Sequence, residues 1–208
     1  MKFYRYINEG NRYPEEYEDI KSILIKKNSK PFLKEFGKMY GSNKYIYRGY
    51  DAGQKTMGYI LKKSRTNRKP RFLPQDVHKH LSKLSKKLWG WDMRTEGVFT
   101  GDDTNASNFG QLWRFIPIGN YKYIYTTEIS DIYYIYDNYE LSNDEEKKEL
   151  IDKLDDLYKT EYKTKNLSSI LRSRVEFESI FKCKEYILVR HPQLYKIIVE
   201  VMKYYNLA

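Results

Sequence analysis

The sequence contains one cysteine, Cys183, among 208 residues. A single cysteine cannot form an internal disulfide, and it excludes a cysteine-rich metal site. This usage fits a reducing compartment, so we expect a cytoplasmic protein. Because Cys183 lies between two apolar segments, a small buried side chain is favoured over a reactive thiol.

Long hydrophobic runs are also missing from the chain. The start, residues 1–5, has no apolar segment of signal-peptide length, and no window reaches the ~18 apolar residues of a membrane span. We therefore expect a soluble protein with no membrane partner. The sequence shows no partners at metal-ligand spacing for His78 and His80, so these two histidines are expected to be solvated on the lysine-rich side of a helix.

Positive charge is abundant, with a formal net charge of +10 and a pI near 9.3. Such a balance favours a nucleic acid, an acidic protein surface or a phosphate-bearing ligand as partner, without choosing among them. A length of 208 residues suits a single domain with its own core.

Apolar spacing predicts helices along much of the chain. The first is expected to open at Pro14 and close near Asn28, and the second to start at Ser29 and end at Gly37 or Gly41. Glycine, proline and capping residues then bound the remaining predicted helices, which span residues 74–89, 104–110, 130–139, 143–162, 167–171 and 192–205.

Strands are predicted between these helices from β-favouring residues and turn signals. Residues 44–50, 96–103 and 176–189 are expected to be strands. Residues 112–118 and 121–125 flank Gly119-Asn120, a typical tight-turn pair, and predict a hairpin of two strands. Pro117 suggests an edge or a bulge near that turn.

Two glutamates, Glu176 and Glu178, stand two residues apart before an apolar run. In a strand they would project from the same face while Phe177 turns into the core. Two adjacent carboxylates repel each other unless a cation or donor compensates, so the pair is a candidate for chemistry on an electron-poor centre. The alternative is a solvated strand edge carrying two surface acids.

Basic residues occur at two further places of interest. Arg48, followed by Gly49, ends a predicted strand, where a guanidinium can grip phosphate while glycine lets a ligand approach; a surface arginine is the alternative. Residues 62–74 form an extended basic loop that contains Arg65, Arg68, Lys69 and Arg71. This loop could cover a phosphate-bearing ligand, grip nucleic acid, or be a solvated charged segment.

Three of these segments together resemble a known family. Tyr47-Arg48-Gly49, then Val98-Phe99-Thr100-Gly101 with a helix running to Phe109-Gly110, then Glu176-Phe177-Glu178 follow one another as in the mono-ADP-ribosyltransferases of the arginine, serine-threonine-serine, Glu-x-Glu class. The resemblance covers roughly residues 44–190. In the middle motif this chain keeps one hydroxyl, Thr100, where the family has serines. Its general look is similar to that of small transferases encoded by bacterial viruses.

The resemblance implies a role for each matching residue. Glu178 would stabilise the ribose oxocarbenium formed when NAD loses nicotinamide, and Glu176 would orient the acceptor, as in arginine-modifying members. Thr100 would bond Glu178 and fix its rotamer. The NAD contacts would come from Arg48, Gly49, Thr100, Phe109 and Arg71. Glu185 is the second choice for the catalytic acid, because Cys183 stands where its acidic partner would be.

The resemblance also implies a fold and an activity. We expect an α+β domain over residues 1–208, with a helical part (1–43), a core of two packed, mostly antiparallel sheets forming an NAD cleft (44–190) and a terminal helix (191–208). The expected activity is transfer of ADP-ribose from NAD to a protein acceptor, with arginine favoured, in the cytoplasm of a host cell or after packaging in a virion. The alternative is a basic nucleic-acid-binding or virion protein with the same fold and no turnover.

Overall fold

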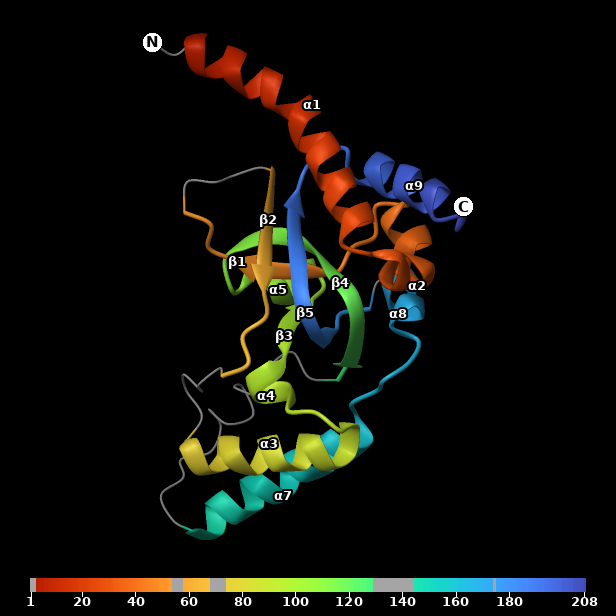
Figure 1. Ribbon diagram of the computed structural model, residues 1–208. Coiled ribbons are helices and arrows are strands. Elements are labelled where there is room, and N and C mark those ends of the chain that lie inside the picture. The colour runs from red at the N-terminus through yellow and green to blue at the C-terminus, as the bar shows by residue number, and fades with distance from the viewer. Residues whose placement is uncertain (1–2, 54–57, 68–73, 129–143, 174) are drawn as a thin grey trace.

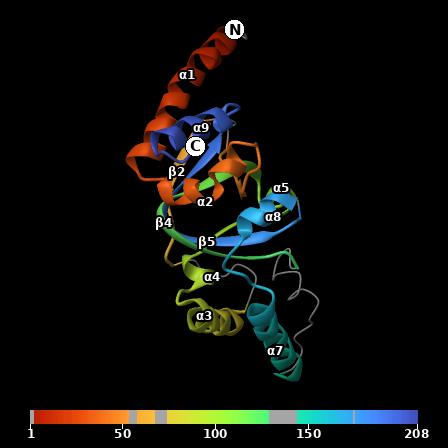
Figure 2. The same cartoon turned by 90° about the vertical axis from the view of Figure 1, so that its right-hand side faces the viewer.

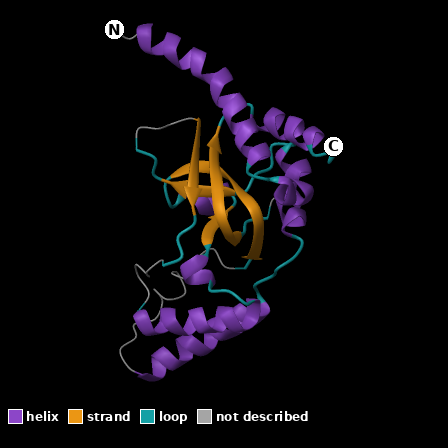
Figure 3. Cartoon of the chain, viewed as in Figure 1, coloured by secondary structure: helices purple, strands orange, loops and turns teal. Residues whose placement is uncertain are grey.

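A computed structural model describes residues 3–53, 58–67, 74–128, 144–173 and 175–208. Within these ranges the chain forms eight helices and five strands, so the fold is α+β, as the sequence predicts. The strands occupy the middle of the molecule (Figure 1). At one end in Figure 1 lie α1 (Phe3–Lys26), α2 (Lys30–Tyr40) and α9 (Leu194–Tyr204), and at the other lie α3 (Gln75–Trp89) and α7 (Asp144–Thr160). Figure 3 shows the same division by colour, with the orange strands gathered between two groups of purple helices.

The strands close into a small barrel rather than two packed sheets. β5 (Glu178–Arg190) pairs with β4 (Gln111–Thr126) and with β3 (Val98–Gly101), and β1 (Tyr47–Tyr50) pairs with both β3 and β4. The circuit β4–β5–β3–β1–β4 is therefore complete, and all these pairings are antiparallel. The expectation of two packed sheets around a cleft is wrong, because the long strands β4 and β5 pair with each other and with the short strands β1 and β3 in one closed sheet.

The predicted hairpin around Gly119-Asn120 is one continuous strand, β4. Both halves of β4 pair with β5, and the register shifts between Ile118 and Tyr121. Gly119 has a φ of 71°, and its N–H donates to the Asn28 carbonyl at 3.0 Å. The glycine thus forms a bulge that bends the strand instead of a turn that reverses it.

One strand was not expected from the sequence. β2 (Gly58–Lys63) lies in register with β5, from Gly58 opposite Arg190 to Lys63 opposite Glu185. β2 and β3 share the same edge of β5, since β3 pairs with its first residues and β2 with its last. The start of the expected basic loop is therefore part of the sheet.

Helices at the N-terminal end follow the apolar pattern, with one difference in length. α1 (Phe3–Lys26) extends well before Pro14, which lies inside the helix instead of opening it. α2 (Lys30–Tyr40) matches the expectation and ends before Gly41. α2 and α9 (Leu194–Tyr204) pack beside the barrel, as the second view shows (Figure 2).

α3 and α7 lie at the opposite end of the molecule (Figure 1). α3 (Gln75–Trp89) ends at Gly90 in the left-handed conformation, as the sequence predicts. The expectation that His78 is solvated is wrong, since His78 is 7% exposed. The remaining helices are α4 (Met93–Glu96), α5 (Asp103–Ser107), α7 (Asp144–Thr160) and α8 (Leu167–Ser173).

The buried apolar side chains form two clusters, which meet at the barrel. The larger cluster joins α1, α2, α8 and α9 to the strands, and the smaller one joins α3 and α7 to Ile124 of β4 and Ile180 of β5. The expected helix at residues 130–139 lies outside the described residues. Among the described helices, none has the length and apolar character needed to cross a membrane.

Candidate functional site

The three segments of the suspected motif lie on adjacent strands. Gly101 of β3 pairs with Tyr47 of β1 on one side and with Glu178 of β5 on the other. Arg48 is the next residue after Tyr47, and Thr100 precedes Gly101. Residues separated by more than half of the chain are therefore neighbours across three strands.

Glu178 is the buried acid of this region, with 7% of its surface exposed. The Tyr162 hydroxyl donates to its Oε1 at 3.1 Å. Burial raises the pKa of Tyr162, and the negative charge of Glu178 raises it further, so the phenol stays protonated and can keep donating. The ring of Trp89 lies 5.7 Å from that of Tyr162, and these two rings form an aromatic layer in which Tyr162 contacts the carboxylate.

Glu176 does not share this environment. It is exposed and precedes β5, which begins at Glu178. Glu176 and Glu178 therefore do not form the side-by-side pair expected from strand alternation. Regular strand geometry begins only at Glu178, after the buried residue Phe177.

Asp102 and Asn105 position the acidic segment, and neither was singled out from the sequence. The Phe177 N–H donates to Asp102 Oδ2 at 2.7 Å, and Asn105 Nδ2 donates to the Phe177 carbonyl at 3.2 Å. Asp102 also caps α5 by accepting from the Asn105 N–H at 2.7 Å. The Asp-x-x-Asn spacing is a helix-cap signal that can be read from the sequence. The bonds of Asp102 and Asn105 to Phe177 cannot, because Phe177 is far along the chain.

Thr100 is bonded to Ser179 instead of Glu178. Its hydroxyl donates to the Ser179 carbonyl at 3.0 Å and lies 2.8 Å from Ser179 Oγ. Thr100 pairs with Ser179 and Gly101 pairs with Glu178, so Thr100 and Glu178 project from opposite faces of the sheet. The Thr100 hydroxyl therefore holds the backbone at Ser179, next to Glu178. This bond to Ser179 takes the place of the expected bond to the Glu178 carboxylate.

Arg48 is engaged by the protein in this structure. Its Nη1 donates to the Phe99 carbonyl at 2.7 Å, and its guanidinium carbon lies 5.8 Å from the centre of the Tyr186 ring. Burial lowers the pKa of Arg48, and Nε is buried without a hydrogen-bond partner among the described residues.

Gly49 lies against the end of α5, next to Phe109. A Cβ at Gly49 would lie 2.1 Å from the Ala106 carbonyl oxygen and 2.8 Å from Phe109 Cβ, so the glycine is needed for packing against the end of α5. Phe109 itself is 62% exposed. Its outward ring is available for an external contact.

The remaining candidate residues lie elsewhere. Arg71 is outside the described residues, together with Arg68 and Lys69 of the same loop. Glu185, the second choice for the acid, accepts from Lys27 Nζ at 2.8 Å on the α1 side of the barrel. Burial raises the pKa of the Cys183 thiol to about 11, in line with the expected buried cysteine.

A cavity of about 590 Å³ lies beside this region. Trp89 and Thr164 line it, and Arg48, Thr100 and Glu178 do not. Trp89 thus lines the cavity and also packs on Tyr162, which donates to Glu178. Among the described residues, no group of three or more histidine, cysteine or acidic side chains could hold a metal ion.

Comparison with known proteins adds no assignment to this geometry. No family model, curated protein or solved structure matches the chain. Function is therefore argued from the residues alone.

Proposed function

We propose that the chain is a mono-ADP-ribosyltransferase that cleaves NAD, releases nicotinamide and transfers ADP-ribose to a protein acceptor, with arginine favoured. The observation that carries the proposal is the register of Tyr47, Gly101 and Glu178 across three strands. It brings the three distant segments of the family resemblance side by side on adjacent strands, with Arg48 and Thr100 projecting from the face opposite to that of Glu178. A fold alone does not establish activity, which depends on the chemistry of Arg48, Thr100 and Glu178.

Glu178 is the residue proposed to act on the ribose. Cleavage of the nicotinamide bond leaves positive charge on the sugar, and a fixed carboxylate stabilises that charge in the transition state. Tyr162, rather than Thr100, holds the carboxylate, through the 3.1 Å hydrogen bond. The phenol donates to Oε1 and so orients the carboxyl group.

Turnover requires this region to open. Glu178 is 7% exposed, and Tyr162 covers one of its oxygens, so NAD reaches the acid only after Tyr162 moves. Arg48 binds phosphates only if its guanidinium exchanges the Phe99 carbonyl for the ligand. The proposal therefore includes a conformational change on NAD binding.

Glu178→Gln tests the assignment directly. The amide oxygen can still accept from Tyr162, so the fold is kept while the charge is removed. We expect nicotinamide release, measured with labelled NAD, to fall by about 10²- to 10³-fold, while NAD binding measured by calorimetry changes little. A variant that keeps full turnover would show that Glu178 is not the acid.

Two matched variants complete the experiment. Glu185→Gln removes a carboxylate on the α1 side of the same strand and should leave turnover unchanged. Glu176→Gln should lower transfer to arginine more than it lowers hydrolysis of NAD. Loss of turnover in Glu185→Gln alone would move the acid to the second-choice position, and a wild-type protein that releases no nicotinamide would overturn the proposal.

A further inference from the structure

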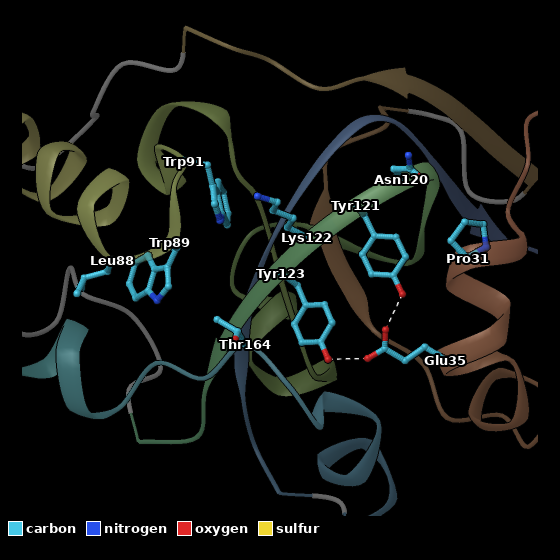
Figure 4. A pocket seen from close by; sticks show the side chains of 10 residues that line it. All are labelled: Pro31, Glu35, Leu88, Trp89, Trp91, Asn120, Tyr121, Lys122, Tyr123 and Thr164. Atoms are coloured by element: carbon cyan, nitrogen blue, oxygen red, sulfur yellow. Dashed lines mark hydrogen bonds between the residues drawn. The ribbon is translucent and has the colours of Figure 1, made fainter.

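The cavity beside the aromatic layer has the composition of a ligand site. It lies across β4, between the end of α3 and the start of α2 (Figure 4). Its volume, about 590 Å³, falls within the usual range for small-molecule pockets. The lining residues are Pro31, Glu35, Leu88, Trp89, Trp91, Asn120, Tyr121, Lys122, Tyr123 and Thr164.

Aromatic rings supply two sides of the cavity. Figure 4 shows Trp89 and Trp91 on the side of α3, and Tyr121 and Tyr123 on the strand between the two helices. Trp91 is 2% exposed, whereas Trp89 is half-buried and offers part of its ring. Planar aromatic surface of this kind suits stacking with a flat ring of a ligand.

The tyrosines are fixed in place by an acid. The hydroxyls of Tyr121 and Tyr123 donate to the two oxygens of Glu35 at 2.7 and 2.5 Å. Burial, and then the bond to Glu35, raise the pKa of both phenols, so they remain neutral donors. The Glu35 charge disfavours an anion at the α2 end of the cavity.

A cation stands on the strand between the two walls. Lys122 is exposed and lies opposite Lys182 in the β4–β5 register, and Lys182 forms an ion pair with Glu96. Lys122 has no ion pair among the described residues, so its charge is available to a ligand. Electrostatics thus divides the cavity into a cationic part near Lys122 and an anionic end at Glu35.

We propose that this cavity binds a nucleobase of a single-stranded nucleic acid, with the base against Trp89 and the adjoining phosphate at Lys122. A base is flat and a phosphate is anionic, and this pairing matches the aromatic wall and the cation. The net charge of +10 favours a polyanion over a single nucleotide. A free nucleotide shares the same chemistry, and the experiment separates the two sources. The inference does not depend on NAD cleavage, since Glu178 lies outside the cavity.

The test is titration of the full chain with a fluorescein-labelled single-stranded DNA oligonucleotide, followed by anisotropy and by tryptophan emission. We expect binding to quench tryptophan emission. Lys122→Glu should weaken binding by about ten-fold and reduce the slope of log affinity against log salt by about 0.7. Trp89→Leu should weaken binding by about ten-fold or more through lost stacking.

Lys184→Glu is the matched control. Lys184 is exposed on β5 and does not line the cavity, and its substitution changes the net charge by the same amount. It should weaken binding far less than Lys122→Glu. Because Trp89 also packs on Tyr158 and Tyr162, thermal unfolding of Trp89→Leu is recorded, and the exposed Lys122 variant carries the test if that protein is unstable.

Three results from the DNA titrations would overturn the proposal. They are equal loss in Lys122→Glu and Lys184→Glu, binding without tryptophan quenching, and equal affinity for double-stranded DNA. Quenching of tryptophan emission by AMP with no binding of the oligonucleotide would assign the cavity to free nucleotides and overturn the proposal, and oligonucleotide binding that AMP does not displace would assign it to the polymer. Glu178→Gln should bind the oligonucleotide as the wild type does, so failure of NAD turnover leaves this result unaffected.

Discussion

At the scale of single residues, a buried hydroxyl joins α2 to the barrel. Tyr40 has none of its surface exposed, and its hydroxyl donates to the Phe115 carbonyl. The same oxygen accepts from the Ile46 N–H at 3.1 Å. Since Ile46 leads into β1 and Phe115 belongs to β4, one phenol satisfies two backbone groups at the point where these segments meet.

Tyr40→Phe should therefore destabilise the protein by about 2 kcal/mol, because a buried N–H and a buried carbonyl each lose a partner. Urea unfolding followed by circular dichroism measures the change. Tyr204→Phe is the control, since Tyr204 is 62% exposed, and it should alter stability by under about 0.5 kcal/mol. Equal effects in the two variants would show that the Tyr40 hydroxyl contributes nothing specific.

The sequence identified residues by chemical type more successfully than by partner. It selected Arg48, Thr100 and Glu178, and the structure places their segments on neighbouring strands. It did not anticipate that Thr100 would bond Ser179, or that Tyr162 would bond Glu178. Which face a side chain takes depends on strand register, and register is set by the opposite strand rather than by the local sequence.

At the scale of elements, α5 and the start of β5 are fastened together through Asp102. The carboxylate accepts from the N–H of Phe177 and from the N–H of Asn105, both at 2.7 Å. One side chain thus caps a helix and fixes the backbone residue before Glu178. Its removal affects two elements at once.

We expect Asp102→Ala to lower stability by about 2 kcal/mol, since it removes a cap and leaves the Phe177 N–H without its acceptor. Asp103→Ala provides the comparison, because Asp103 is exposed and bonds the N–H of the following residue, Thr104, at 3.1 Å. That variant should change stability by under about 0.5 kcal/mol. Urea unfolding measures both changes in stability. A smaller loss for Asp102→Ala than for Asp103→Ala would contradict the claim that Asp102 joins α5 to β5.

Two helices, α2 and α3, were predictable in full from the sequence, whereas two strands, β2 and β4, were not. α2 and α3 have their apolar positions at helical spacing and carry their own stop signals at Gly41 and Gly90, so local sequence defines them. β4 was mistaken for a hairpin because Gly119-Asn120 suits either a turn or a bulge. The choice is made by β5, which pairs with both halves of the strand. β2 was missed for a related reason, since residues 58–63 form a strand through their pairing with β5 and not through a local sequence signal.

At the scale of the whole molecule, the barrel separates two groups of buried side chains. Leu154 of α7 belongs to the smaller cluster, which lies between α3, α7 and the barrel, and Leu33 of α2 belongs to the larger one. Leu154 is fully buried and Leu33 is 1% exposed. Figures 1 and 2 place these helices at opposite ends of the molecule. Local stability in such a molecule can differ from one end to the other.

Leu154→Ala and Leu33→Ala form a matched pair for testing this division. Each substitution leaves a void in its cluster and should lower the free energy of unfolding by about 2–5 kcal/mol. By amide hydrogen exchange, Leu154→Ala should lower protection in α3 and α7 while α2 and α9 keep theirs, and Leu33→Ala should do the reverse. If either variant lowered protection equally throughout, the barrel would be coupling both clusters into one cooperative unit. Because Ile124 and Ile180 reach the smaller cluster from the barrel strands, β4 and β5 should show intermediate losses in both variants.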